Sequence, residues 1–169
     1  MAESIRKRFS KSLLEKIGAH FTLVQHRKVF TAHDKAATLH VDPGAVVKTA
    51  VFRAGAKERI LVLVPASKHI DKKRVKTAVN IWLRKQSKKP EKLVDFANEQ
   101  WMKKNMPGDV GATPSLPEQL GMHAFVDNRL FKQPKLYLNI GSYEESILVN
   151  RVNFKKILGD VFTKGSFAK

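Results

Sequence analysis

The sequence predicts an α+β domain in which helices surround a central mixed, largely antiparallel and barrel-like sheet. Two β-rich runs lie together near the middle of the chain, several short strand-like runs follow toward the C-terminus, and stretches with helical apolar spacing flank both groups. At 169 residues the chain can form one well-buried core, so we expect one compact domain with a terminal extension.

The N-terminal segment is predicted to be a helix outside that domain. Ile5, Phe9, Leu13 and Ile17 recur every four residues and so share one helical stripe, and Gly18 is a natural helix stop. We therefore assign residues 1–18 to an N-terminal helical extension and residues 19–169 to the domain. A short strand over residues 21–24 and a loop over residues 26–31 should begin the domain.

A β-hairpin is expected at the centre of the sheet. The runs AVVKTAVFRA (residues 45–54) and RILVLVPA (59–66) are rich in β-branched residues and are separated by a Gly-containing turn. The second run is apolar at both parities, which predicts burial on both faces. Before the hairpin, residues 32–41 should form a short helix that ends at the turn Asp42-Pro43-Gly44.

Helices and further strands should complete the domain after the hairpin. Apolar residues at helical spacing predict helices over residues 71–85 and 91–104. The segments HAFVD, KLYLNIG and SILVN read as strands, and a closing amphipathic helix is expected to bury Phe154, Ile157, Leu158, Val161 and Phe162.

The net charge points to a polyanionic partner. The chain has 32 Lys+Arg against 15 Asp+Glu, a formal charge of +17, so nucleic acid is the first candidate and a membrane surface the second. No apolar run of about 18 residues that could span a membrane occurs in the sequence. The basic residues concentrate in the segment 68–104, and those that could contact tRNA are Lys72, Lys73, Arg74, Lys76, Arg84, Lys85, Lys88 and Lys89. A merely solvated helix face is the alternative for any one of them.

Cysteine is absent, which excludes disulfides, thiolate nucleophiles and Cys-ligated zinc. The histidines are scattered, and no GxSxG, HExxH, Walker or GxGxxG motif occurs. We expect a cytoplasmic protein with neither a cofactor nor a metal site.

Two features could carry chemistry. Lys48 shares its strand parity with Val46, Ala50 and Phe52, so its ammonium must either reach the edge of an apolar face or meet an anion. The loop Gly111-Ala112-Thr113-Pro114 can turn backbone amides toward a carbonyl or carboxylate oxygen, although most such strings are simple turns.

In combination these elements resemble the YbaK/prolyl-tRNA synthetase-associated editing domain family. The similarity runs from about Phe21 to Leu158. It rests on VQHRKVFTAHDKA, on DPGAVVKTAVFRA with RILVLVPASKHIDKKRV, on VGATPSL, and on HAFVDNRLFKQPKLYLNIGSYEESILVNRVNFKKIL. The family's fold is the α+β architecture expected above.

The resemblance implies a hydrolase that cleaves the ester between a wrongly attached amino acid and the 3′-terminal adenosine of tRNA. It also implies an attacking water or ribose hydroxyl in place of a protein nucleophile, and tRNA as partner, with prolyl-tRNA synthetase or another synthetase as a second candidate. By position, the catalytic group would be Lys48, which holds the terminal nucleotide or its phosphate and orients the ester, together with Gly111 and Thr113. The substrate-binding group would be His26, Thr31, Ala112, Pro114, Asp127, Asn139 and Ser142.

The implied substrate is tRNA-Pro that carries alanine or cysteine, or a serine or threonine error. Asn139 stands where alanine-specific members often have a histidine, and Ser115-Leu116 follows the loop in place of Phe-Gly or Leu-Gly, so all four amino acids stay open. The rival hypothesis is a non-catalytic tRNA-binding or scaffold module, appended to or associated with a synthetase, in which the basic helices provide the function. A small structural protein of a ribonucleoprotein is a third reading, which the pocket elements disfavour.

Overall fold

The computed structural model describes residue 12 and residues 14–169. The predicted N-terminal helix therefore lies largely outside the described residues, including Ile5, Phe9 and Leu13 of its stripe. Residues 14–16 are helical, and Leu14 packs into the main core with 1% of its surface exposed.

The larger of two sheets has five strands in the order β4-β2-β3-β5-β8. The predicted hairpin forms its centre: β2 (Val47–Ala54) and β3 (Glu58–Pro65) pair antiparallel along their full lengths. On one side β4 (Val94–Phe96) pairs antiparallel with β2, and on the other β5 (His123–Asp127) and β8 (Phe162–Gly165) continue the sheet in parallel. The sheet is therefore mixed, as expected.

A smaller antiparallel sheet has the order β1-β7-β6. It contains β1 (Thr22–Gln25), β6 (Lys135–Asn139) and β7 (Glu145–Asn150). One parallel bridge between Val46, just before β2, and Tyr137 of β6 joins it to the larger sheet. The predicted α+β class is confirmed, with the strands divided between two sheets.

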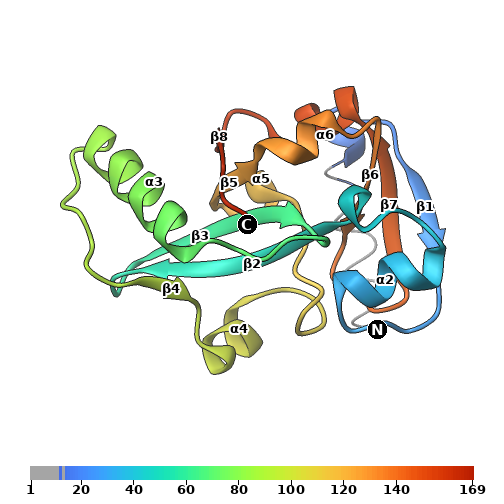
Figure 1. The fold of residues 1–169 in the computed structure, drawn as a ribbon, viewed down its shortest axis with the longest axis horizontal. Coiled ribbons are helices and arrows are strands. Elements are labelled where there is room, and N and C mark those ends of the chain that lie inside the picture. The colour runs from blue at the N-terminus through green and yellow to red at the C-terminus, as the bar shows by residue number, and fades with distance from the viewer. Residues whose placement is uncertain (1–11, 13) are drawn as a thin grey trace.

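The helices are short and lie around both sheets (Figure 1). Figure 1 shows α3 at one end of the long axis, and α2, β1, β6 and β7 at the other. No helix of the described residues is long and apolar enough to cross a membrane. The helices are α2 (Ala32–Leu39), α3 (Lys72–Lys85), α4 (Glu99–Asn105), α5 (Pro117–Leu120) and α6 (Arg151–Leu158), with 3-10 turns η1 (Pro43–Ala45) and η2 (Asn128–Lys132).

Two predicted helices differ in the structure. The prediction of one helix over residues 91–104 is wrong, because residues 94–96 pair with the open edge of β2 as strand β4, and α4 starts only after Asn98 caps it by accepting from two backbone amides. The closing helix ends at Leu158, where Gly159 has a positive φ of 58°. Phe162 belongs to β8, since its backbone pairs with β5.

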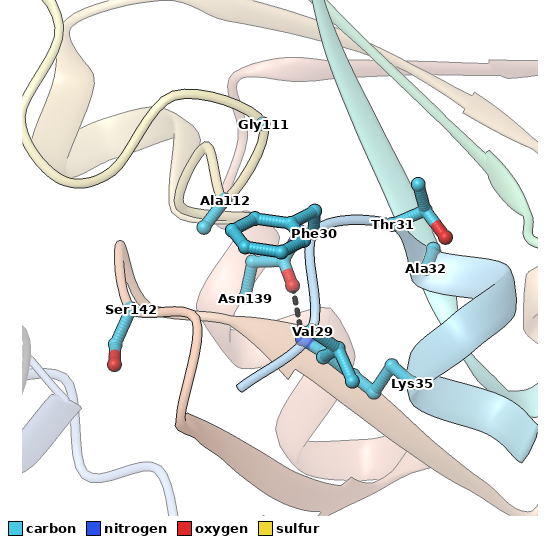
Figure 2. Close-up of a pocket in the computed structure, with 9 residues that line it drawn as sticks. All are labelled: Val29, Phe30, Thr31, Ala32, Lys35, Gly111, Ala112, Asn139 and Ser142. Carbon is cyan, nitrogen blue, oxygen red and sulfur yellow. Dashed lines mark hydrogen bonds between the residues drawn. The ribbon is translucent and has the colours of Figure 1, made fainter. Parts of the chain in front are cut away.

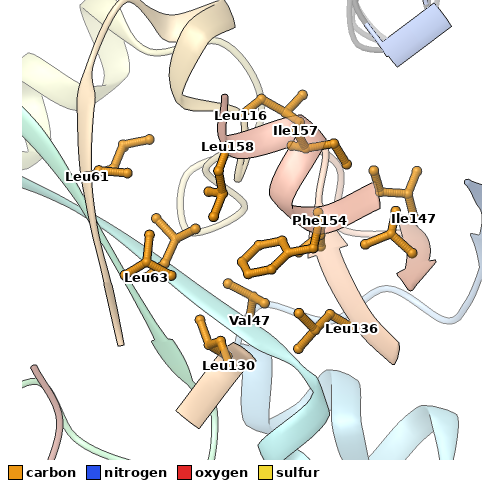
Figure 3. Packing of buried hydrophobic residues seen from close by; sticks show 14 of the residues in the cluster. Val47, Leu61, Leu63, Leu116, Leu130, Leu136, Ile147, Phe154, Ile157 and Leu158 are labelled. Atoms are coloured by element: carbon orange, nitrogen blue, oxygen red, sulfur yellow. The ribbon is translucent and has the colours of Figure 1, made fainter. Parts of the chain in front are cut away.

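The two faces of the larger sheet bury separate hydrophobic clusters. One cluster contains Val47 and Val51 of β2 and the α6 side chains Phe154, Ile157 and Leu158 (Figure 3). The other contains Phe52 and the buried stripe of α3, namely Val75, Val79 and Leu83. Alternate residues of β2 therefore point to different layers of the protein.

Candidate functional site

A small pocket forms between the loop that precedes α2, the loop that precedes α5 and the end of β6. Figure 2 shows side chains from these segments gathered around one space, and the empty volume there is at most about 190 Å³. This volume includes open solvent, so the pocket is small. Its lining residues are Val29, Phe30, Thr31, Ala32, Lys35, Gly111, Ala112, Asn139 and Ser142.

Close backbone packing fixes the pocket loop that contains Gly111. Gly108 and Gly141 face each other, both at positive φ, and a Cβ on Gly108 would lie 2.5 Å from the Gly141 Cα. The Asp109 amide donates to Gly141 O at 2.9 Å, and the Ser115 amide donates to Asn139 O at 3.0 Å. Both ends of the loop are thus tied to the segment that follows β6.

Side chains tie the same loop to its neighbours. The Thr49 and Ser115 hydroxyls are buried and hydrogen-bonded to each other at 2.8 Å, which links β2 to the loop. The Tyr143 hydroxyl donates to Val110 O. Pro114 is buried, and its ring contacts the position that a Cβ on Gly141 would occupy. The loop is therefore held in one conformation before any ligand binds, as preorganised catalysis requires.

The loop has backbone donors to offer to a substrate oxygen. The amide of Ala112 is already used, because it donates to Asp109 O at 3.0 Å. The amides of Gly111 and Thr113, by contrast, donate to no group of residue 12 or residues 14–169. Gly111 adopts φ +87°, a conformation that favours glycine. These two amides are the groups that could hold a developing oxyanion.

Lys35 is the one residue of the pocket lining that carries a charge. Its side chain is 3% exposed, and its ammonium donates to the Asn139 Oδ1 atom. Burial lowers the pKa of Lys35 from 10.5 to about 8, because the charged form loses its hydration. An ammonium in this position is costly, which makes Lys35 the most unusual group of the site.

His26 and Thr31 hold the loop that precedes α2. Since a carbonyl can only accept, His26 Nδ1 donates to Arg27 O at 2.8 Å, and Nε2 then accepts from the Ser146 hydroxyl at 2.9 Å. Burial of the ring is the main cause that lowers the pKa of His26. Thr31 lines the pocket and caps α2 by accepting from the Asp34 amide at 3.0 Å. His26 is not part of the pocket lining; it directly follows β1 and contacts β7 through Ser146.

An aromatic pair lies at the mouth of the pocket. Phe30 lines the pocket, is 59% exposed and meets Tyr143 edge to face, with 4.8 Å between the ring centroids. The Lys28 ammonium lies 5.7 Å from the Phe30 centroid and 5.8 Å from that of Tyr143. A flat apolar face beside a cation is a surface on which a nucleotide can stack.

The structure does not bring Lys48 and Asp127 into this pocket. Lys48 lies on the opposite face of β2 from Thr49, and its ammonium donates to Lys68 O at 2.6 Å, in the loop before α3. Partial burial lowers its pKa. Asp127 is fully buried and accepts from the backbone amides of Phe167 and Ala168, so it holds the C-terminal segment. Thr113 and Pro114 are buried, and neither is among the residues that line the pocket.

The predicted tRNA-binding residues lie on the exposed side of α3 and in the loop after it. Lys72, Arg74 and Lys88 form ion pairs with Asp95, Asp71 and Glu58. The other five have no carboxylate partner among the described residues, so they are free to meet phosphates: Lys73, Lys76, Arg84, Lys85 and Lys89.

The sequence prediction missed Lys35 and Phe30. The pattern contained a signal for the first, since Lys35 shares the helical spacing of the buried Ala32 and Ala36 and so falls on the inward face of α2. Nothing in the pattern marked Phe30, because its position at the pocket mouth depends on the contact with Tyr143. Within the described part of the chain, no three His, Asp or Glu side chains gather as a metal site.

Known proteins agree with this description. Three solved structures share the fold at low sequence identity. A scaffold protein from the computational grafting of linear epitopes and a protein described as a proposed trans-editing enzyme for prolyl-tRNA synthetase are each 18% identical over 97% of both chains, with TM-scores of 0.74 and 0.72. A hypothetical protein is 19% identical over 95% of this chain and 99% of its own, with a TM-score of 0.74. No curated protein sequence matches the chain. The sequence matches the aminoacyl-tRNA editing domain family over residues 26–157. Because this match spans most of the chain, the protein belongs to the aminoacyl-tRNA editing domain family.

Proposed function

We propose that this chain is an aminoacyl-tRNA deacylase, which hydrolyses the ester of a tRNA that carries the wrong amino acid. One observation supports this proposal above the others: the rigid loop holds the amides of Gly111 and Thr113, which donate to none of the described residues, next to a small pocket. A carbonyl oxygen needs such donors when it becomes an oxyanion.

The reaction requires the protein to place water next to the ester carbonyl and to stabilise the negative charge that forms. Water adds to the ester carbonyl, and the resulting oxyanion accepts hydrogen bonds from the two loop amides. The bond between the carbonyl carbon and the ribose oxygen then breaks, and the ribose oxygen leaves with a proton as a hydroxyl group. Because the ester is already activated, correct placement of water and carbonyl supplies most of the rate enhancement.

The features around the pocket suit the end of an RNA chain. The terminal adenine would stack on Phe30 and Tyr143, and Lys28 would face the nucleotide's phosphate. Lys48 lies outside the pocket, on the face of β2 that looks toward the loop before α3, and there it would contact the terminal nucleotide or its phosphate and so orient the ester. The unpaired cations of α3 lie at the far end of the long axis and would hold the tRNA body (Figure 1).

The amino acid removed should be small, with alanine, cysteine, serine and threonine as the candidates. A synthetase pocket separates such residues by only about 1–3 kcal/mol, which is why a second hydrolytic site is needed. The proline-specific tRNA is the first to test, because one structural neighbour is described as acting for prolyl-tRNA synthetase.

Release of amino acid from purified misacylated tRNA tests the proposal. The wild-type chain should release at least one of the four amino acids far above the uncatalysed rate. Tight, salt-sensitive binding of tRNA without turnover on any ester would favour the scaffold hypothesis instead.

A further inference from the structure

Lys35 is buried and has no counter-ion among the described residues. Its nitrogen has three hydrogen-bond donors, and Asn139 Oδ1 accepts one of them. No other acceptor and no carboxylate of the described residues bonds to it or lies within ion-pair distance. A buried ammonium with unused donors is unfavourable, so its presence in the pocket wall indicates that a ligand completes its hydrogen bonds.

The position of Lys35 decides which part of a ligand it meets. The loop amides belong to the wall that contains Gly111, whereas Lys35 projects from α2 on another wall (Figure 2). A substrate whose ester carbonyl faces the loop would direct its amino-acid side chain toward the rest of the lining. There it would find the Lys35 donors together with the apolar surfaces of Val29, Ala32 and Ala112.

We propose that Lys35, held by Asn139, is the specificity-determining residue of this pocket and selects a β-hydroxy amino acid, serine or threonine, over alanine. This inference rests on the proposed deacylase function. The side-chain hydroxyl would accept from the Lys35 ammonium, and the methyl group of threonine would contact the apolar part of the lining. An alanyl group would leave the remaining donors of the ammonium without an acceptor.

The expected discrimination follows from the cost of that unpaired donor. A hydrogen bond to a charged group changes affinity by about 10- to 100-fold, and sites built to bind a hydroxyl reject analogues that lack it more strongly than apolar pockets reject an added hydroxyl. Lys35→Met keeps the length and apolar stem of the side chain but removes every donor. The variant should therefore lose the preference for the hydroxyl group, while the ester still binds at the same place.

The experiment compares seryl and alanyl substrates on wild type, Lys35→Met and Lys57→Met. Lys57 is an exposed residue of the turn between β2 and β3 and serves as the matched control. Rates of hydrolysis are measured with Ser-tRNA and Ala-tRNA. In parallel, affinities are measured for 3′-seryl-amino and 3′-alanyl-amino adenosine, whose amide bonds resist hydrolysis. Wild type and Lys57→Met should prefer the seryl compound at least about tenfold in both assays, and Lys35→Met should lose this preference.

Other results separate the two proposals. If the seryl amide binds preferentially through Lys35 but no ester is hydrolysed, the specificity assignment stands and the deacylase proposal fails. If esters are hydrolysed with an unchanged seryl-to-alanyl ratio in Lys35→Met, the specificity assignment is overturned. An equal loss of activity on both esters would also overturn it, because Lys35 would then act on the ester itself. Circular dichroism spectra of the variants establish that each is folded.

Discussion

Replacement of Lys35 by methionine should change how the stability of the protein depends on pH. Burial lowers the pKa of Lys35 to about 8 in the folded protein, against 10.5 in the unfolded chain. The unfolded chain therefore binds an extra proton between these two values, and the wild type gains stability as the pH rises through this window. Below pH 8 the buried charge lowers the unfolding free energy by about 3 kcal/mol, and above pH 10.5 this cost has disappeared.

Urea unfolding of both proteins at pH 7, 8, 9 and 10 measures this effect. Other lysines begin to titrate at the upper end of the range, but they are common to both proteins and cancel in the difference. Between pH 7 and pH 10 the unfolding free energy of the wild type should rise by about 2–3 kcal/mol relative to that of Lys35→Met. At pH 7 the variant should be the same as or more stable than wild type, because the buried charge is gone while Asn139 loses a partner at a cost of about 1–3 kcal/mol.

A difference between Lys35→Met and wild type that stays constant from pH 7 to pH 10 would refute this reasoning. It would mean that the ammonium is solvated in the folded protein. Lys35 would then have no unused donors with which to select a hydroxyl group. Lys57→Met supplies the comparison, since this lysine is exposed.

Three further variants test other parts of the site. Gly108→Ala should lower the unfolding free energy by about 2–5 kcal/mol in urea, because a Cβ there meets backbone at 2.5 Å and φ is +91°; a change below 0.5 kcal/mol would contradict the packing described. Phe30→Ala should weaken binding of tRNA ending in CCA by about 5- to 100-fold in a filter-binding assay, with stability unchanged. Unaltered affinity would mean that the terminal adenine does not stack on Phe30. The triple variant Arg84→Gln, Lys85→Gln and Lys89→Gln should reduce the slope of log affinity against log salt by about 2–3, whereas an unchanged slope would place the tRNA body elsewhere.

Local patterns predicted the centre of the fold well. The hairpin of β2 and β3 followed from two β-rich runs and one short turn, and the burial of β3 on both faces followed from its unbroken apolar content. The segment 91–104 could not be predicted in the same way. Its few apolar residues fit a helix, but the open edge of β2 supplies hydrogen bonds that make residues 94–96 a strand.

The site was predictable only where resemblance or strong local signals existed. Gly111, Ala112, Asn139 and Ser142, which the resemblance named as site residues, line one pocket, and their roles stay a prediction. The alternation of β2 placed Lys48 on the correct face, yet it could not show that this face looks toward the loop before α3 and not into the pocket. The helical spacing of α2 could place Lys35 on the inward face, but its contact with Asn139, which is far away in the sequence, is contained in no local pattern.

The central claim is that this chain hydrolyses the ester of a misacylated tRNA. The most direct measurement follows release of labelled serine, threonine, alanine and cysteine from tRNA-Pro by the purified wild-type chain. We expect turnover of serine or threonine that is faster than turnover of alanine. Stoichiometric binding of tRNA without release of any amino acid would contradict the claim.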